Sequence, residues 1–167
     1  MTIILDGKNL SKKIIEDIKI NTTKYEKKPT LAVFLVGKNP ASQIYVKNKQ
    51  RQAEYVGFNS IVNELPHDIS ENDLLEQIYI MNDSPDINAI LVQLPLPENL
   101  NQQKILEAID PIKDVDCFTS YNFGWLALGY NPYVLPCTPK GIIRLLDEYK
   151  INLEGKNAIV IGRSNIV

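Results

Sequence analysis

Lys49 lies where a charged side chain is costly. When residues 41–56 are placed on a helical wheel, Lys49 falls in the middle of an apolar arc, with Ser42 beside it. The arc consists of Ala41, Tyr45, Val46, Ala53 and Val56. Two interpretations are open. The lysine can extend to the edge of a packed interface, or it can lie in a cleft and exchange a proton near neutral pH, because partial burial disfavours its charged form. In the second case Tyr45, one helical turn away, shares the pocket.

Gln93 interrupts the apolar segment "ILVQLPLP" close to the carboxyl end of a predicted strand. Ligands bind at this end of open parallel sheets. A buried glutamine also needs hydrogen-bond partners, and loop backbone is the simpler source of them. Its position beside the turn at Pro95 and Pro97 keeps a role in a site as the competing interpretation.

The segment "DPIKDVDCF" holds three carboxylates. Asp110, before a proline, is typical of a turn or a helix end, and Asp114 of a solvated loop charge or local cap. Asp116 stands between apolar residues, where a carboxylate needs a donor. Cys137 and the lone histidine, His67, are predicted to be structural.

Composition excludes several classes of function. A net charge of -2 gives no electrostatic reason to expect a nucleic acid or an anionic membrane as partner. The apolar runs are too short to span a bilayer, and the first residues do not match a signal peptide. Two cysteines without CxxC spacing predict neither a metal site nor a disulfide framework, so we expect a reducing, cytoplasmic compartment.

Helix and strand signals alternate along the chain. They predict an α/β fold, with a mainly parallel sheet flanked by helices. Asn39 as N-cap, Pro40 and the later Gly57 mark the ends of one helix, and Ser70 with Asp73 marks the start of another. Helices are predicted at 11–26, 40–56, 70–83, 101–110 and 138–150, and strands at 30–37, 58–65, 87–97 and 156–161.

The last predicted strand runs into a turn at Gly162, Arg163 and Ser164. This pattern is typical of the first βα unit of a Rossmann-type nucleotide-binding domain, which needs on the order of 100 further residues. We therefore expect one domain over 1–150 and the truncated start of a second over 151–167.

Five segments occur in the order found in a known family and span nearly the whole chain. They are "VGKNPASQIYVKNK", "ILVQLPLP", "DPIKDVDCF", "PCTPKG" and "VIGRSNIV". The sequence resembles the N-terminal catalytic part of the bifunctional methylenetetrahydrofolate dehydrogenase/methenyltetrahydrofolate cyclohydrolases, followed by the start of their NADP domain.

The resemblance implies a role for each candidate residue. Lys49 matches the catalytic lysine, and Tyr45 matches the tyrosine that packs against the folate. Gln93 matches the glutamine that partners the lysine, and Asp116 the aspartate that holds the polar edge of the pterin. Ser42 lies in the same motif as Lys49 and is expected to line the site.

The resemblance also implies two reactions. The first oxidises 5,10-methylenetetrahydrofolate to the methenyl cation with NADP, and the second hydrolyses that cation to 10-formyltetrahydrofolate. Gly162, Arg163 and Ser164 would belong to the cofactor site, where Arg163 can pair with a 2′-phosphate. The resemblance also implies a homodimer for the full-length protein. One departure is Cys117, where the family has glycine, because a side chain crowds the loop if the backbone needs a positive φ.

Other interpretations remain. The chain as given can be a folate-binding domain that lacks dehydrogenase activity, or an interaction module that has lost its substrate site. The pair Tyr45-x-x-x-Lys49 also matches short-chain dehydrogenases, but in that class the nucleotide turn precedes the pair, whereas here Gly162 follows it by more than a hundred residues.

Overall fold

The computed structural model describes residues 4–163. Its helices are α1 (Gly7–Thr22), α2 (Pro40–Tyr55), α3 (Glu71–Asp83), α4 (Gln102–Glu107), α5 (Ser120–Ala127) and α6 (Cys137–Glu148). Its strands are β1 (Thr30–Val36), β2 (Asn59–Leu65) and β3 (Ala89–Val92). Within this part of the chain, none of the helices combines the length and the apolar character that crossing a membrane requires.

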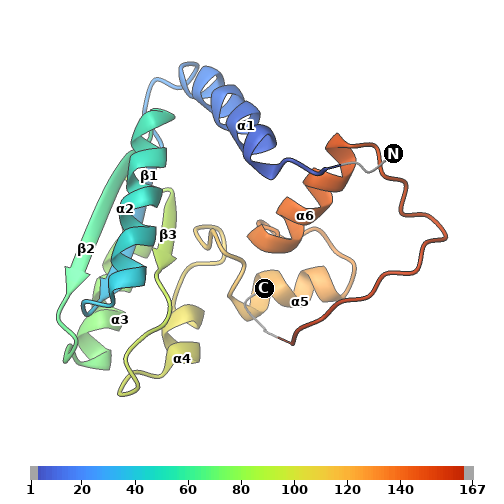
Figure 1. Cartoon of the computed structure of the whole chain (residues 1–167). Helices are drawn as coiled ribbons and strands as arrows, with labels where there is room; N and C mark the ends of the chain where they lie inside the picture. The colour runs from blue at the N-terminus through green and yellow to red at the C-terminus, as the bar shows by residue number, and fades with distance from the viewer. Residues whose placement is uncertain (1–3, 164–167) are drawn as a thin grey trace.

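The three strands form one parallel sheet in the order β2-β1-β3. The central strand β1 is placed by its pairing with both neighbours, for instance Ala32 opposite Ile61 on one side and Ile90 on the other. Parallel neighbours need crossover connections, and helices α2 and α3 supply them (Figure 1). The predicted α/β fold with a parallel sheet flanked by helices is confirmed.

Each face of β1 packs against a different helix layer. On one face Ala32, Phe34 and Val36 meet α3 and α4, through residues such as Leu74 and Ile105. On the other face Val33 and Leu35 meet Val46 of α2. Burial on both faces explains why this strand is a continuous apolar run rather than an alternating one. Because the strands are parallel, their carboxyl ends lie at one edge of the sheet, where the loops can carry a site.

Local signals determine where α2 and α3 begin. The Asn39 side chain accepts a hydrogen bond from the amide of Ser42, at 3.1 Å, and Pro40 occupies the first turn. Ser70 caps α3 by accepting from the amide of Asp73, also at 3.1 Å. Both predicted starts are confirmed, because each cap depends on residues only three apart.

Helix α5 was not among the predicted elements. Gly124 stands in its middle, and Asn122 is its one buried residue, so it lacks the apolar stripe that indicates an amphipathic helix. Thr119 caps it by accepting from the amide of Asn122.

The predicted strand at 156–161 is wrong for the residues that the structure describes. Residues 157–163 have no regular secondary structure, and Ile159, Val160 and Ile161 are 88%, 88% and 97% exposed. A strand needs a neighbour to pair with, and in Figure 1 this segment lies on the side of α5 and α6, apart from the sheet. The division at 150/151 stays a prediction.

Candidate active site

Lys49 lies on the buried side of α2. The fully buried residues of this helix are Ser42, Val46 and Ala53, and Lys49 lies among them, half-buried. The helical wheel placed Ala41 and Tyr45 in the apolar arc, and this prediction was wrong. Both residues are exposed, and Tyr45 keeps 60% of its surface accessible to solvent. Helix α2 covers the sheet with a stripe narrower than the predicted arc, so residues at its margin remain open to solvent.

Gln93 continues the line of β3 and holds the amine of Lys49. Its backbone amide donates to Phe34 at 2.9 Å, which extends the β1–β3 pairing by one residue. Its side-chain Nε2 donates to the carbonyl of Leu94 at 2.7 Å, and Oε1 accepts from Lys49 Nζ at 3.3 Å. The two interpretations of Gln93 are therefore compatible: loop backbone fixes the amide, and the fixed amide faces the lysine.

A cavity of about 500 Å³ opens beside this pair. Polar groups line it from three elements: Tyr45 and Lys49 of α2, Asp116 of the loop between α4 and α5, and Cys137 at the start of α6. The other lining residues come from α1, β1, α2, the loop between α2 and β2, β3 and the loop between α4 and α5, and all but Asn48 and Gln52 are apolar: Ile15, Ile18, Leu31, Asn48, Gln52, Ala53, Val56, Phe58, Leu91 and Val115. Three predicted site residues thus meet in one space, with Gln93 directly behind Lys49. Ser42 is buried in the first turn of α2 and is not among the lining residues.

Asp116 faces competing electrostatic influences. Burial raises the pKa of its carboxyl above the usual range, the charge of Lys49 opposes that shift, and the charge of Asp114 adds to it. The Cys137 thiol, whose Sγ lies 3.4 Å from the carbonyl of Val115, also lowers this pKa. The result is a carboxylate held near a lysine in a largely apolar cavity, a setting suited to binding N–H groups of a ligand.

Asp114 is not a solvated loop charge, so that prediction is wrong. It is 1% exposed, and its carboxylate accepts from Asp116, Phe118, Thr119 and Asn122. The alternative of a local cap is closer to what is found. This burial could not be predicted from the sequence, because donors such as Thr119 and Asn122 reach the carboxylate only when the chain folds back over it.

Cys117 has a positive φ of 62° and is buried. The condition for the predicted crowding is therefore met, because the backbone at Cys117 adopts the left-handed conformation. Burial, followed by the charges of Asp114 and Cys137, raises the pKa of the Cys117 thiol to about 11. The thiol is thus kept in its neutral form.

Cys137 was predicted to be structural, yet it lies at the cavity. Burial, followed mainly by the charge of Asp116, raises the pKa of its thiol, which argues against a nucleophilic role. The motif "PCTPKG" could have indicated that Cys137 lies near the site, since it places the cysteine at the start of a helix.

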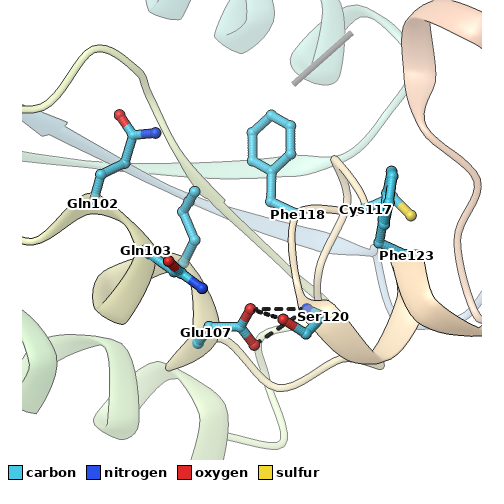
Figure 2. A pocket seen from close by; sticks show the side chains of 8 residues that line it. Gln102, Gln103, Glu107, Cys117, Phe118, Ser120 and Phe123 are labelled. Carbon is cyan, nitrogen blue, oxygen red and sulfur yellow. Dashed lines mark hydrogen bonds between the residues drawn. The ribbon is translucent and has the colours of Figure 1, made fainter. Parts of the chain in front are cut away.

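A smaller cavity of about 270 Å³ lies beside Cys117 and Phe118 (Figure 2). Cys117 and Phe118 line it together with residues of α4 and α5, and Glu107 accepts hydrogen bonds from the backbone and the hydroxyl of Ser120. No residue predicted for the site lines this second cavity. It is close to Asp116 only because Cys117, the next residue in the chain, lines it.

The two predicted cofactor residues that the structure describes do not line the cavity. Gly162 and Arg163 are exposed at the end of the extended segment, and Ser164 lies outside the described residues. Between residues 4 and 163, no group of three or more His, Cys, Asp or Glu side chains is placed to hold a metal ion.

Two sequence models match the chain. Residues 5–116 match the catalytic domain of tetrahydrofolate dehydrogenase/cyclohydrolase, and residues 136–167 match its NAD(P)-binding domain. The bifunctional protein FolD of a Nitratiruptor species is 53% identical over 168 residues, which cover 98% of this chain and 59% of that protein.

Solved structures agree. The bifunctional FolD enzyme from Campylobacter jejuni superposes with a TM-score of 0.96 at 47% identity, over 99% of this chain and 60% of the other. The Trypanosoma brucei enzyme, solved with NADP cofactor and inhibitor, has a TM-score of 0.87 at 30% identity, over 93% and 54%. The chain thus spans about 59% of the length of its Nitratiruptor relative. The chain belongs to the tetrahydrofolate dehydrogenase/cyclohydrolase family.

Proposed function

We propose that this protein interconverts one-carbon derivatives of tetrahydrofolate. It oxidises 5,10-methylenetetrahydrofolate to 5,10-methenyltetrahydrofolate with NADP, and hydrolyses the product to 10-formyltetrahydrofolate. Family membership supports the reaction class. The observation that carries the assignment to this site is the meeting of Tyr45, Lys49 and Asp116 in one cavity, with Gln93 bonded to the lysine.

Lys49 is the residue proposed to move the proton. Hydrolysis adds water to the methenyl carbon and then breaks the bond from that carbon to N5. A proton must leave the water as the C–O bond forms, and N5 must take up a proton as its bond breaks. An amine at the cavity wall can receive or relay that proton. Gln93 helps by accepting from Nζ at 3.3 Å, which restricts where the amine points. The long lysine side chain is thereby positioned before the substrate arrives.

Asp116 and Tyr45 are proposed to bind the substrate. A pterin presents adjacent N–H donors along one edge, and a carboxylate can accept from two of them at once. Tyr45 is exposed, so its ring is available as a flat surface against the substrate's ring system. The apolar walls of the cavity exclude water from the remainder of the ring. Ser42 is assigned a supporting role in the fold of α2 rather than a contact, because it is buried away from the cavity.

The described end of the chain does not fit a dinucleotide. Residues 157–163 offer no strand, and Ile159 to Ile161 are almost fully exposed, so no phosphate or ribose contact is formed by them. The choice of NADP as hydride acceptor is supported by the match to an NAD(P)-binding domain and by the relative solved with NADP. A homodimer and a cytoplasmic location belong to the same proposal.

A second candidate function follows from the same segment. Because the described residues 157–163 form no cofactor site, a polypeptide limited to these 167 residues would bind folate without dehydrogenase activity. The short-chain dehydrogenase interpretation of Tyr45 and Lys49 is set aside by the family match.

Hydrolysis of 5,10-methenyltetrahydrofolate by the purified chain tests the proposal, because this reaction requires no cofactor. Turnover above the uncatalysed rate, together with saturable binding of tetrahydrofolate, is expected. A folded chain that neither binds tetrahydrofolate nor hydrolyses the methenyl compound would contradict the assignment of the cavity.

A further inference from the structure

The loop that carries Asp116 is organised around the buried carboxylate of Asp114. Oδ1 accepts from the backbone amides of Asp116 at 3.3 Å and Phe118 at 3.2 Å. Oδ2 accepts from the amide of Thr119 at 2.9 Å and from its hydroxyl at 2.8 Å. The side-chain amide of Asn122 also donates to Oδ2, at 3.2 Å. Five donors thus converge on one carboxylate.

All these donors are neutral. Among the ion pairs formed within residues 4–163, none includes Asp114. A carboxylate that is 1% exposed is costly to bury, and these hydrogen bonds are what offset that cost. Hydrogen bonds are directional, unlike a diffuse charge interaction, so the carboxylate dictates where each backbone amide must lie.

Asp114 itself is anchored to the sheet. The amide of Ile90 in β3 donates to the carbonyl of Lys113 at 2.8 Å, and Ile90 and Asp114 form an isolated parallel bridge. The pairing with β3 therefore fixes the position of the Asp114 carboxylate relative to the sheet. A connection runs from β3 through Asp114 to the amide of Asp116, whose side chain lines the cavity.

The same network reaches the other wall of the cavity. Asn122 is fully buried, and its Nδ2 also donates to the carbonyl of Pro111 at 2.8 Å. Its Oδ1 accepts from the amide of Tyr133 at 3.1 Å, four residues before Cys137. The segments that bring Asp116 and Cys137 to the cavity thus share one buried polar centre.

We propose that Asp114 is a positioning residue for the candidate folate site: its buried carboxylate holds the 116–119 backbone so that the Asp116 side chain faces the cavity. The proposal rests on the proposed function for the identity of the ligand. Asp114 does not line the cavity, so it acts through Asp116 and not on the substrate.

The test compares Asp114→Asn with Asp110→Asn in the 167-residue chain. An amide at position 114 has one acceptor oxygen and must turn an NH2 group toward N–H donors, so the loop has to shift. At position 110 the side chain accepts only from Ile112, at 3.0 Å, which an amide does equally well. We expect tetrahydrofolate binding to weaken at least about tenfold in Asp114→Asn and to stay within about twofold in Asp110→Asn.

A double-mutant cycle separates positioning from loss of fold. If Asp114 acts through Asp116, Asp114→Asn should change binding by less than about twofold once Asp116→Ala is present. The KM for 5,10-methenyltetrahydrofolate should rise while kcat stays within about threefold, because Lys49 and Gln93 are untouched. An equal effect in both backgrounds, or unchanged binding in a folded Asp114→Asn variant, would overturn the proposal.

If Asp114→Asn does not fold, Thr119→Val and Thr119→Ser replace it. The valine removes the hydroxyl that donates to Asp114 and that also caps α5, and the serine keeps both interactions. Weaker binding in the valine variant alone is expected, and identical binding in both would overturn the proposal. Amide hydrogen exchange gives a readout without folate: in the valine variant the amides of 116, 118 and 119 should exchange faster. A chain that binds no folate would sink the proposed function, while the exchange data would still decide the role of Asp114.

Discussion

Lys49 Nζ lies 3.3 Å from Gln93 Oε1, although the two residues are 44 positions apart in the chain. One comes from the middle of α2 and the other from the residue that follows β3. The contact joins the helix to the carboxyl edge of the sheet, beside the cavity that also holds Asp116. It is the relationship on which the assignment of a proton-transfer group depends.

Lys49→Met should abolish methenyltetrahydrofolate hydrolysis while the fold stays intact, because methionine keeps most of the side-chain volume and cannot exchange a proton. Lys47→Met, on the exposed side of the same helix, is the matched control. Both are measured by turnover with circular dichroism as the check on folding. Activity of Lys49→Met within about threefold of the unaltered chain, less than ~1 kcal/mol in activation free energy, would contradict the assignment.

Asp116→Ala and Asp116→Asn should both weaken binding of tetrahydrofolate. Alanine removes the carboxylate, and the amide of asparagine cannot accept at both positions. A loss of about tenfold or more is expected for each, since hydrogen bonds to a charged group contribute roughly 1.5–3 kcal/mol. Equilibrium titration checks this, and unchanged affinity in both variants would place Asp116 outside the site.

The raised pKa of Asp116 makes a prediction about stability. Because burial raises the folded-state pKa, the folded protein holds this proton more tightly than the unfolded chain. The associated stability is present below the unfolded pKa of about 3.9 and is lost as pH rises through the folded pKa. Relative to Asp116→Asn, the unfolding free energy of the unaltered chain should therefore fall as pH increases above about 4.

Chemical denaturation at several pH values measures this difference. The asparagine variant serves as the reference, because it keeps the size of the side chain and does not titrate. An unfolding free energy that instead rises with pH relative to this reference would mean that the environment of Asp116 favours its charged form.

Cys117→Gly should be more stable than Cys117→Ala by about 1 kcal/mol, the reverse of the usual order. At a φ of 62° alanine keeps the left-handed strain, whereas glycine has none. Both variants lose the same sulfur, so the pair isolates the backbone contribution. Thermal or urea unfolding provides the comparison, and greater stability of the alanine variant would show that this backbone is not strained.

The 167-residue chain should produce no measurable NADPH from 5,10-methylenetetrahydrofolate, while retaining tetrahydrofolate binding. The reason is that residues 157–163 are irregular and exposed, and the predicted turn at Gly162 without flanking strands would be only a weak anion site. Spectrophotometric detection of NADPH decides the matter, with the Trypanosoma brucei dehydrogenase-cyclohydrolase, which was solved with NADP, as positive control. Comparable turnover in both would mean that cofactor binding resides elsewhere in this chain.

Local features of the sequence were enough to predict most of the framework. The caps at Asn39 and Ser70 join groups three residues apart, and helical periodicity alone places Lys49 on the packed side of α2. The apolar run of β1 indicates a strand covered on both faces. The caps are formed by neighbours in the chain, and the other two features follow from the spacing of apolar residues along it, so the sequence determined them.

Other features depended on groups that only the tertiary structure brings together. The burial of Asp114 is decided by the turn that returns Thr119 and Asn122 to its carboxylate, and nothing in "DPIKDVDCF" distinguishes that outcome from solvation. Residues 157–161 have the composition of a strand, but a strand forms only where a partner completes its hydrogen bonds. The contact between Lys49 and Gln93 likewise depends on how α2 packs against β1 and on the register of β1 with β3. The sequence by itself determined which side chains were available for chemistry, and strand pairing and packing decided which of them meet.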